Sequence, residues 1–149
     1  MRSIKNIELF NSKRSIIRSF NDNKFNLILT PRQWGLTTLL IDYINQIPHD
    51  KTIFFALSNP AVIRGITMRI THPDCWVQSI KESSVVGRRF DYIICDNFFN
   101  GSWLKNLILL APSLKEDGKI ILADSGRYLG DHIIEHFREY NKIIKTSLD

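Results

Sequence analysis

The chain is poor in the residues that define several protein classes. Its 149 residues include 2 cysteines, 5 prolines and 7 glycines. Cys75 and Cys95 form no metal-binding motif, and two cysteines alone do not imply a disulfide framework. Glycine and proline are too scarce for a collagen-like or low-complexity chain. The composition therefore excludes fibrous, low-complexity and disulfide-scaffold proteins and fits an ordinary globular one.

Long hydrophobic runs are also missing. Runs such as Leu107–Pro112 and Ile120–Ala123 fall far short of the roughly 18 residues that a membrane-spanning helix needs. Met1–Phe10 mixes lysine, asparagine and glutamate into its apolar residues and contains no signal-peptide core. We therefore expect no membrane partner and a cytoplasmic location with reduced cysteines, which is the host-cell cytoplasm if the protein is viral.

Charge is unevenly distributed. The net charge of the chain is +5. Residues 1–32 hold seven basic and two acidic side chains, whereas residues 33–149 hold thirteen of each, so the whole excess lies in the first fifth of the chain. Such a segment is either a solubilising arm or a surface that binds polyanions such as DNA. Its last members, Lys24 and Arg32, flank a predicted strand, which favours an anion site there.

Apolar runs of four to six residues alternate with stretches of helical periodicity. The predicted strands are 25–29, 52–57, 75–80, 90–95, 119–123 and 142–146. The predicted helices are 13–21, 35–47, 60–70, 102–114 and 131–140. No linker or repeat divides residues 1–149. This alternation predicts a single three-layer, doubly wound α/β domain with a mainly parallel sheet. Ligands of such sheets bind beyond the carboxyl ends of the strands.

The first strand end to consider is Thr30–Thr38, which joins a predicted strand to a predicted helix. Gly35 stands at the turn, and Thr37 opens the helix. Backbone N–H groups at a helix N-terminus bind anions, and a threonine there can ligate Mg²⁺. Arg32 could place its guanidinium on phosphate oxygens. A plain strand-to-helix turn would show the same pattern, and both interpretations remain open at this point.

Two further strand ends carry polar residues. The strand 90–95 runs into Asp96, as do the strands of P-loop enzymes whose carboxylate holds Mg²⁺. An aspartate that caps the next loop or helix would give the same sequence pattern. The strand 119–123 ends in Asp124, Ser125 and Gly126, which suit either a sensor of a γ-phosphate or a simple turn.

These segments resemble one known family. The stretch NKFNLILTPRQWGLTTLL, residues 23–40, resembles the ATPase domain of the large terminase subunit, the DNA-packaging motor of tailed phages. VGRRFDYIICDNFF, residues 86–99, is similar to that family's Walker B region, and KIILADSG, residues 119–126, to its coupling motif. The three matches occur in the family's order and span roughly residues 20–147.

The resemblance implies a P-loop NTPase-like fold with ATP and Mg²⁺ as cofactors. Arg32 would act on the γ-phosphate, Thr37 and Asp96 would hold Mg²⁺, and Asn97 would occupy the position of the catalytic glutamate. The implied nucleotide-binding residues are Gln33, Trp34, Gly35, Leu36, Thr37 and Thr38. Asp124, Ser125 and Gly126 would form the coupling element. The implied partners are phage packaging proteins or DNA, together with further copies of the chain.

The chain departs from the family pattern at two charged positions. Leu36 replaces the P-loop lysine that neutralises phosphate charge. Asn97 replaces the catalytic glutamate and cannot act as a general base. We also expect no counterpart of the family's nuclease domain within these 149 residues. We therefore expect a degenerate ATPase, weak or inactive, or a pseudo-enzyme kept as a regulatory binding module.

A class I S-adenosylmethionine-dependent methyltransferase is the alternative. Residues 90–124 resemble the second half of that fold. The first half fits less well, because residues 31–35 contain one glycine and Ser58 replaces the acidic residue that would bind ribose hydroxyls. Binding of S-adenosylmethionine would discriminate between the two interpretations.

Overall fold

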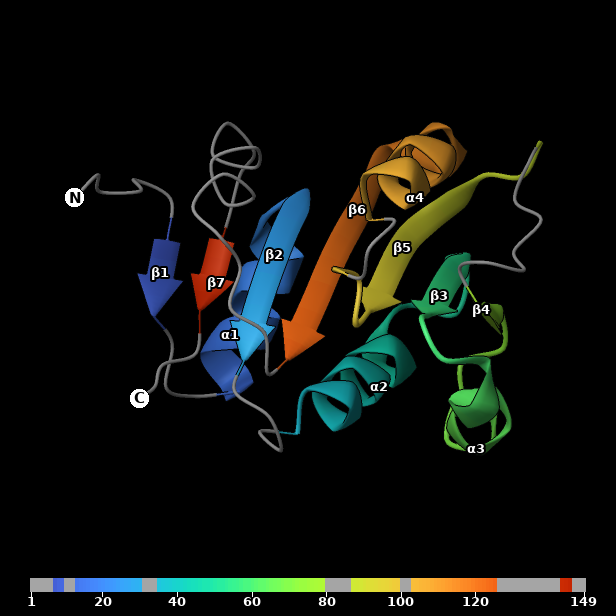
Figure 1. Cartoon of the computed structure of the whole chain (residues 1–149), viewed down its shortest axis with the longest axis horizontal. Coiled ribbons are helices and arrows are strands. Elements are labelled where there is room, and N and C mark those ends of the chain that lie inside the picture. Colours follow the sequence, from blue (N-terminus) through green and yellow to red (C-terminus); the bar gives the residue numbers. More distant parts are fainter. Residues whose placement is uncertain are drawn as a thin grey trace.

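The described strands form one sheet in which every neighbouring pair is parallel. The computed structural model describes residues 7–9, 13–30, 35–79, 87–99, 103–125 and 143–145. Within these residues the sheet has seven strands, and Figure 1 shows them side by side. Their spatial order is β1 (Ile7–Leu9), β7 (Ile143–Lys145), β2 (Phe25–Thr30), β6 (Leu114–Ser125), β5 (Phe90–Asp96), β3 (Ile53–Leu57) and β4 (Cys75–Ser79).

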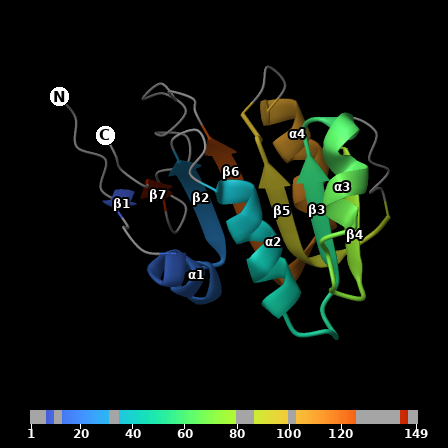
Figure 2. The ribbon, with the colours of Figure 1, turned by 90° about the horizontal axis from the view of Figure 1, so that it is seen from below.

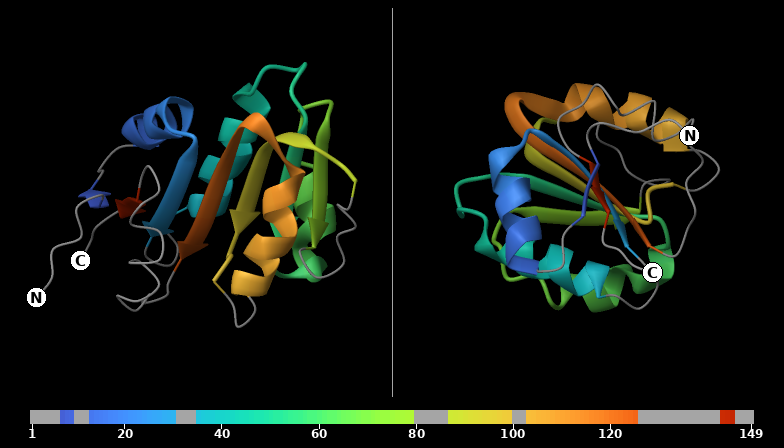
Figure 3. Two further views of the ribbon diagram at one scale, coloured as in Figure 1. Left: turned by 90° about the horizontal axis from the view of Figure 1, so that it is seen from above. Right: turned by 90° about the vertical axis from the view of Figure 1, so that its left-hand side faces the viewer.

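Helices cover both faces of the sheet. Helices α1 (Lys13–Asp22), α2 (Leu36–Gln46) and α3 (Ile63–Thr67) lie on one face, and α4 (Trp103–Leu110) lies on the other (Figures 2 and 3). Two short 3₁₀ turns, Pro60–Val62 and Ala111–Ser113, adjoin α3 and α4.

Each face of the sheet has its own apolar core. Because successive side chains of a strand point to opposite faces, Ile28 packs with α1 and α2, whereas Leu27 and Leu29 pack on the side of α4. The strands therefore read as nearly continuous apolar runs, which is typical of parallel sheets that are buried on both sides.

The structure confirms the predicted α/β class, with a parallel sheet between two layers of helices. The short strand expected at 75–80 is present as β4, and Asn59 caps the turn that begins at Pro60 by accepting a hydrogen bond from the Ala61 N–H at 3.0 Å. The helix expected at 102–114 ends earlier, at Leu110. The helix expected at 131–140 lies outside the described residues.

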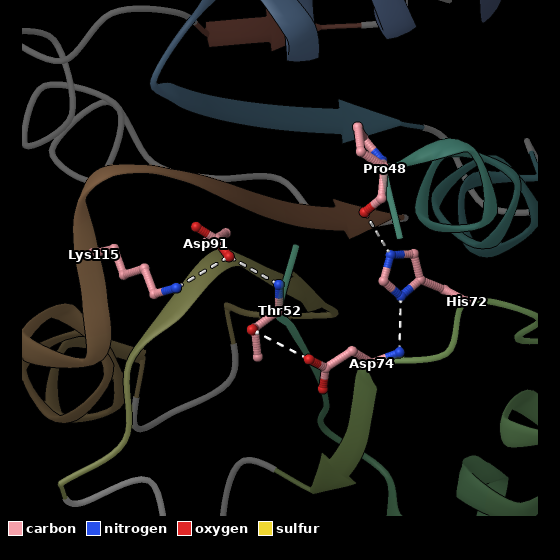
Figure 4. Close-up of polar contacts among 6 residues, drawn as sticks. All are labelled: Pro48, Thr52, His72, Asp74, Asp91 and Lys115. Carbon is pink, nitrogen blue, oxygen red and sulfur yellow. Dashed lines mark hydrogen bonds and ion pairs between the residues drawn. The ribbon is translucent and has the colours of Figure 1, made fainter. Parts of the chain in front are cut away.

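The amino ends of four strands are linked by a polar network (Figure 4). The Thr52 N–H donates to the Asp91 carboxylate at 2.9 Å, and Lys115 Nζ lies 3.3 Å from the same oxygen. The Thr52 hydroxyl donates to Asp74 at 3.3 Å, and the Asp74 N–H donates to His72 Nδ1 at 3.0 Å. This network lies at the edge of the sheet opposite to the strand ends considered below.

No helix among the described residues combines the length and apolar character needed to cross a membrane.

Candidate functional site

The three strand ends singled out from the sequence are neighbours in space. Strand β6 lies between β2 and β5, and all three run in the same direction. In the register of the sheet Thr30 of β2 faces Ser125 of β6, and Leu29 faces Asp124. Asp96 is the last residue of β5. Their carboxyl ends therefore form one continuous edge, from which α2 departs (Figure 1).

Helix α2 begins at this edge with backbone N–H groups that no side chain of the described residues caps. Its N-cap is Gly35, which has φ 93° and ψ 27°, a left-handed conformation that favours glycine. Glycine has no side chain with which to cap the helix, and the described residues supply no other cap there. The N–H groups of the first turn, from Leu36 to Thr38, have no partner within the helix itself and are suited to an anion.

The side chain of Leu36 is buried in the core and is not exposed at the start of α2. It is 4% exposed and packs in the core between α2 and the sheet. Leu36 can thus offer its backbone N–H but no side-chain contact to a ligand, and the position expected to carry a lysine contributes to the hydrophobic core instead.

Thr37 and Asp96 are joined directly, although 59 residues separate them. The Thr37 hydroxyl donates a hydrogen bond of 2.6 Å to Asp96 Oδ2. Thr37 lies in the first turn of α2 and Asp96 ends β5, two strands away from β2 in the sheet. The contact places a carboxylate beside the N-terminus of α2.

Asp96 is buried, with 4% of its surface exposed. Burial raises the pKa of its carboxyl above the usual value, although hydrogen bonds from the Thr37 hydroxyl and the Asn97 N–H act in the opposite direction. An ionised carboxylate at this position is destabilised by its low-polarity surroundings. A cation bound beside it would relieve that cost.

Asp124 and Asn97 shape the loop that follows β5. The buried carboxylate of Asp124 accepts a hydrogen bond from the Phe99 N–H at 2.8 Å, and the Phe98 N–H donates to the Ala123 carbonyl at 3.0 Å. Asn97 is exposed and has φ 52°, a left-handed conformation that asparagine tolerates better than most residues. The ends of β5 and β6 are thereby tied together. The left-handed conformation of the turn is by itself a reason for an asparagine at position 97.

Two residues that were not predicted as site residues also bring a side chain to this edge. Thr30 is 6% exposed, and its hydroxyl has no hydrogen-bond partner within the described residues. Arg69, which follows α3, reaches the first turn of α2, where its Nη2 donates to Thr38 Oγ1 at 3.1 Å. The sequence pattern did not indicate Arg69, because a single arginine in a loop belongs to no motif. Its proximity to α2 depends on how α2 and α3 pack.

Several predicted site residues lie outside the described part of the chain, namely Arg32, Gln33, Trp34 and Gly126. The backbone of Ser125 is placed at the end of β6. The structure thus brings Thr37 of α2 and Asp96 of β5 together beside Gly35. Asp124 lies at the end of β6 at the same edge, but its carboxylate accepts a hydrogen bond from the Phe99 N–H on the side of α4. Phe98 and Phe99, considered as packing or contact residues, are buried and pack in the core on the side of α4.

The residues present suit Mg²⁺ held jointly with a phosphate ligand. Within the described chain no cluster of three or more histidine, cysteine or acidic side chains is placed to hold a metal. Mg²⁺, however, is commonly bound through one or two protein oxygens together with substrate phosphates and water. The Thr37 hydroxyl and the Asp96 carboxylate are oxygen donors of this kind, next to N–H groups that would hold the phosphates.

The fold and this edge define the protein as an α/β protein with a parallel sheet and a polar site at the strand ends. No protein-family model matches the chain, and no curated protein shows significant similarity to it.

Proposed function

We propose that the protein is a P-loop-type nucleotide-binding domain, related to the terminase ATPase domain, that holds a nucleoside triphosphate with Mg²⁺ and hydrolyses it weakly or not at all. The observation that carries the proposal is the 2.6 Å hydrogen bond between Thr37 and Asp96. In P-loop NTPases the loop threonine or serine and the aspartate of a second strand hold Mg²⁺ together. Here these two residue types meet at the N-terminus of α2.

Weak hydrolysis follows from the two departures at the same site. Without a lysine at position 36, the charge on the β- and γ-phosphates is less neutralised in both the ground and the transition state. The amide of Asn97 cannot accept a proton from water. Ligand binding is retained in this proposal because backbone N–H groups and Mg²⁺ supply most of the remaining contacts.

The direct test is a calorimetric titration of the whole chain with ATP, with and without Mg²⁺. We expect saturable binding that Mg²⁺ strengthens in the wild type, and loss of this Mg²⁺ dependence in Asp96→Asn. Asp42→Asn is the matched control, because Asp42 is an exposed carboxylate on the same α2 helix. A folded wild-type protein that does not bind ATP would overturn the proposal.

Hydrolysis is tested by phosphate release from Leu36→Lys/Asn97→Glu. Activity that appears in this double variant and disappears on adding Asp96→Ala would support the site. Because Asn97 has a left-handed conformation, Asn97→Gly is the control that keeps the turn and adds no carboxylate. Phosphate release in the wild type that is as fast as in the double variant and is lost in Asp96→Ala would contradict a degenerate enzyme.

The methyltransferase alternative gains no support from the fold. Its family closes the sheet with a pair of antiparallel strands, whereas every strand pair of the described residues is parallel. The residue after β3 is Ser58, which carries no carboxylate for ribose hydroxyls. Binding of S-adenosylmethionine in the same calorimeter would nevertheless favour this alternative.

The resemblance of the sequence to the terminase ATPase domain supports a role of the protein in phage DNA packaging. In this proposal the partners are packaging proteins, DNA or further copies of the chain. Arg14 and Arg18 belong to the basic segment and lie on α1. Binding of DNA through phosphate contacts would weaken steeply with salt, which a titration at two ionic strengths would measure.

A further inference from the structure

The connection that follows α3 brings an arginine to the site. Arg69 Nη2 donates to Thr38 Oγ1 at 3.1 Å, across 31 residues of sequence. Thr38 is in the first turn of α2, one residue beyond Thr37. The side chains of Arg69 and Thr38 are both exposed, and the guanidinium lies at the same helix end at which Leu36 offers no charged side chain.

The backbone around Arg69 is fixed to α2 by one side chain. Asn45 Nδ2 donates to the Arg69 carbonyl at 3.1 Å, and Asn45 Oδ1 accepts from the Thr71 N–H at 2.8 Å. The Arg69 N–H donates to the Ile66 carbonyl at 2.9 Å. With its main chain anchored beside the second half of α2, Arg69 extends its side chain along the helix toward its first turn.

This arrangement is electrostatically unfavourable without an anion. A helix N-terminus carries partial positive charge and stabilises anions, whereas cations are favoured at the opposite end. Within the described part of the chain no carboxylate forms an ion pair with Arg69. An arginine held at a positive helix end, without a counter-charge, is suited to bind a negatively charged ligand.

A buried hydroxyl provides an independent indication of a ligand at this edge. Thr30 Oγ1 belongs to a residue that is more than nine-tenths buried, and it has no partner among the described residues. Asn26 and Ile28 of β2 face α1 and α2, so the alternation of the strand places Thr30 on that same face, at the end where α2 begins. Buried hydroxyls are ordinarily hydrogen-bonded, and a ligand oxygen or its bound water would provide the missing partner.

We propose that Arg69 binds the phosphates of the nucleotide and supplies the positive charge that Leu36 lacks. This inference rests on the proposed nucleotide site and adds its phosphate-binding residue. One of the five N–H donors of the guanidinium contacts Thr38, and no other described residue occupies the remaining donors, which can bind phosphate oxygens. The planar fork of arginine matches a phosphate better than the single point charge of lysine does.

The test is a titration with MgATP of the wild-type chain, Arg69→Gln, Arg69→Lys and Arg64→Gln. Arg64 is the matched control, because it is an arginine of the adjacent α3 helix and its loss changes the net charge equally. We expect Arg69→Gln to weaken the affinity for MgATP about tenfold or more. The affinity of Arg69→Lys should lie between those of the wild type and Arg69→Gln, and that of Arg64→Gln should stay within about twofold of the wild type.

A second measurement separates ligand binding from a structural role. Because Arg69 opposes the helix dipole, Arg69→Gln should leave the melting temperature of the ligand-free protein unchanged or raise it. If MgATP binds the wild type and Arg69→Gln weakens binding no more than Arg64→Gln does, the role of Arg69 is overturned and the nucleotide site remains. If the folded wild type binds no MgATP, the proposed function itself fails, and this inference fails with it.

Discussion

Asp96 combines burial, a raised pKa and a short hydrogen bond to Thr37. Consider an acid whose pKa is higher in the folded than in the unfolded protein. Once the pH rises above the pKa of the unfolded protein, folding buries a charge, and the acid then destabilises the folded state. The residue therefore costs stability at neutral pH, which is typical of groups retained for function.

The first prediction follows for Asp96→Asn. The neutral amide avoids the burial of a charge and can still accept the Thr37 hydroxyl, so we expect a modest rise in melting temperature at pH 7 together with loss of Mg²⁺-dependent ATP binding. The rise should shrink as the pH is lowered toward the range in which the carboxyl is protonated. A variant that is less stable than the wild type at pH 7 would show that Asp96 has a structural role.

Gly35 and Gly65 form a matched pair for a second prediction. Gly35 has φ 93°, so Gly35→Ala should destabilise the protein by about 1–2 kcal/mol. Gly65 lies within α3, and outside that helix's own backbone and the two chain neighbours no atom of the described residues comes within 4 Å of the position that the alanine Cβ would take. Gly65→Ala should therefore stabilise the protein by about 0.4–1 kcal/mol. Urea unfolding of both variants measures the difference. Equal effects would contradict the left-handed conformation at Gly35.

At the scale of elements, the amino edge of the sheet is held by the network around Asp91. Burial acts to raise the pKa of Asp91, but the hydrogen bond from Thr52 and the ion pair with Lys115 outweigh it and lower the pKa below the usual value. A carboxyl with a lowered pKa in the fold stabilises the protein above its unfolded pKa, and this contribution is lost as pH falls through the folded pKa.

The third prediction concerns this network. Asp91→Asn should cost about 1–2 kcal/mol at pH 7, because the Thr52 N–H and Lys115 lose a charged acceptor. The difference from the wild type should diminish between pH 7 and an acid pH below the lowered pKa of Asp91, because the wild-type carboxyl itself then becomes protonated. Denaturant unfolding at both pH values provides the measurement, with exposed Asp50→Asn as the control. A pH-independent difference would exclude the carboxylate as its source.

The bounds of two strands could not be predicted from the sequence. The strand predicted at 119–123 begins at Leu114 in the structure, because Phe90 of β5 pairs with Leu114 and extends β6 through polar residues. Strand β1, Ile7–Leu9, was not predicted, because it is only three residues long and its middle residue, Glu8, is charged. Both depend on a partner strand that is distant in sequence, which local periodicity does not report.

At the scale of the whole molecule, ligand binding is linked to folding. A ligand that binds only the folded protein stabilises it by about 2.7 kcal/mol at a hundred times its dissociation constant. The fourth prediction is that MgATP raises the unfolding free energy by this amount at such a concentration, whereas S-adenosylmethionine leaves it unchanged. The reverse pattern, measured by denaturant unfolding with each ligand, would favour the methyltransferase alternative.

The sequence by itself determined the α/β class and the apolar strands, because apolar runs of strand length alternate with helical periodicity and both signals are local. It also indicated that Thr37, Asp96 and Asp124 follow strands and belong at one edge of a parallel sheet. Only the tertiary structure decided that β6 separates β2 from β5, that Thr37 contacts Asp96, and that Arg69 reaches α2. Strand order and helix packing are set by contacts between residues tens of positions apart, and the spacing of neighbouring residues does not encode them.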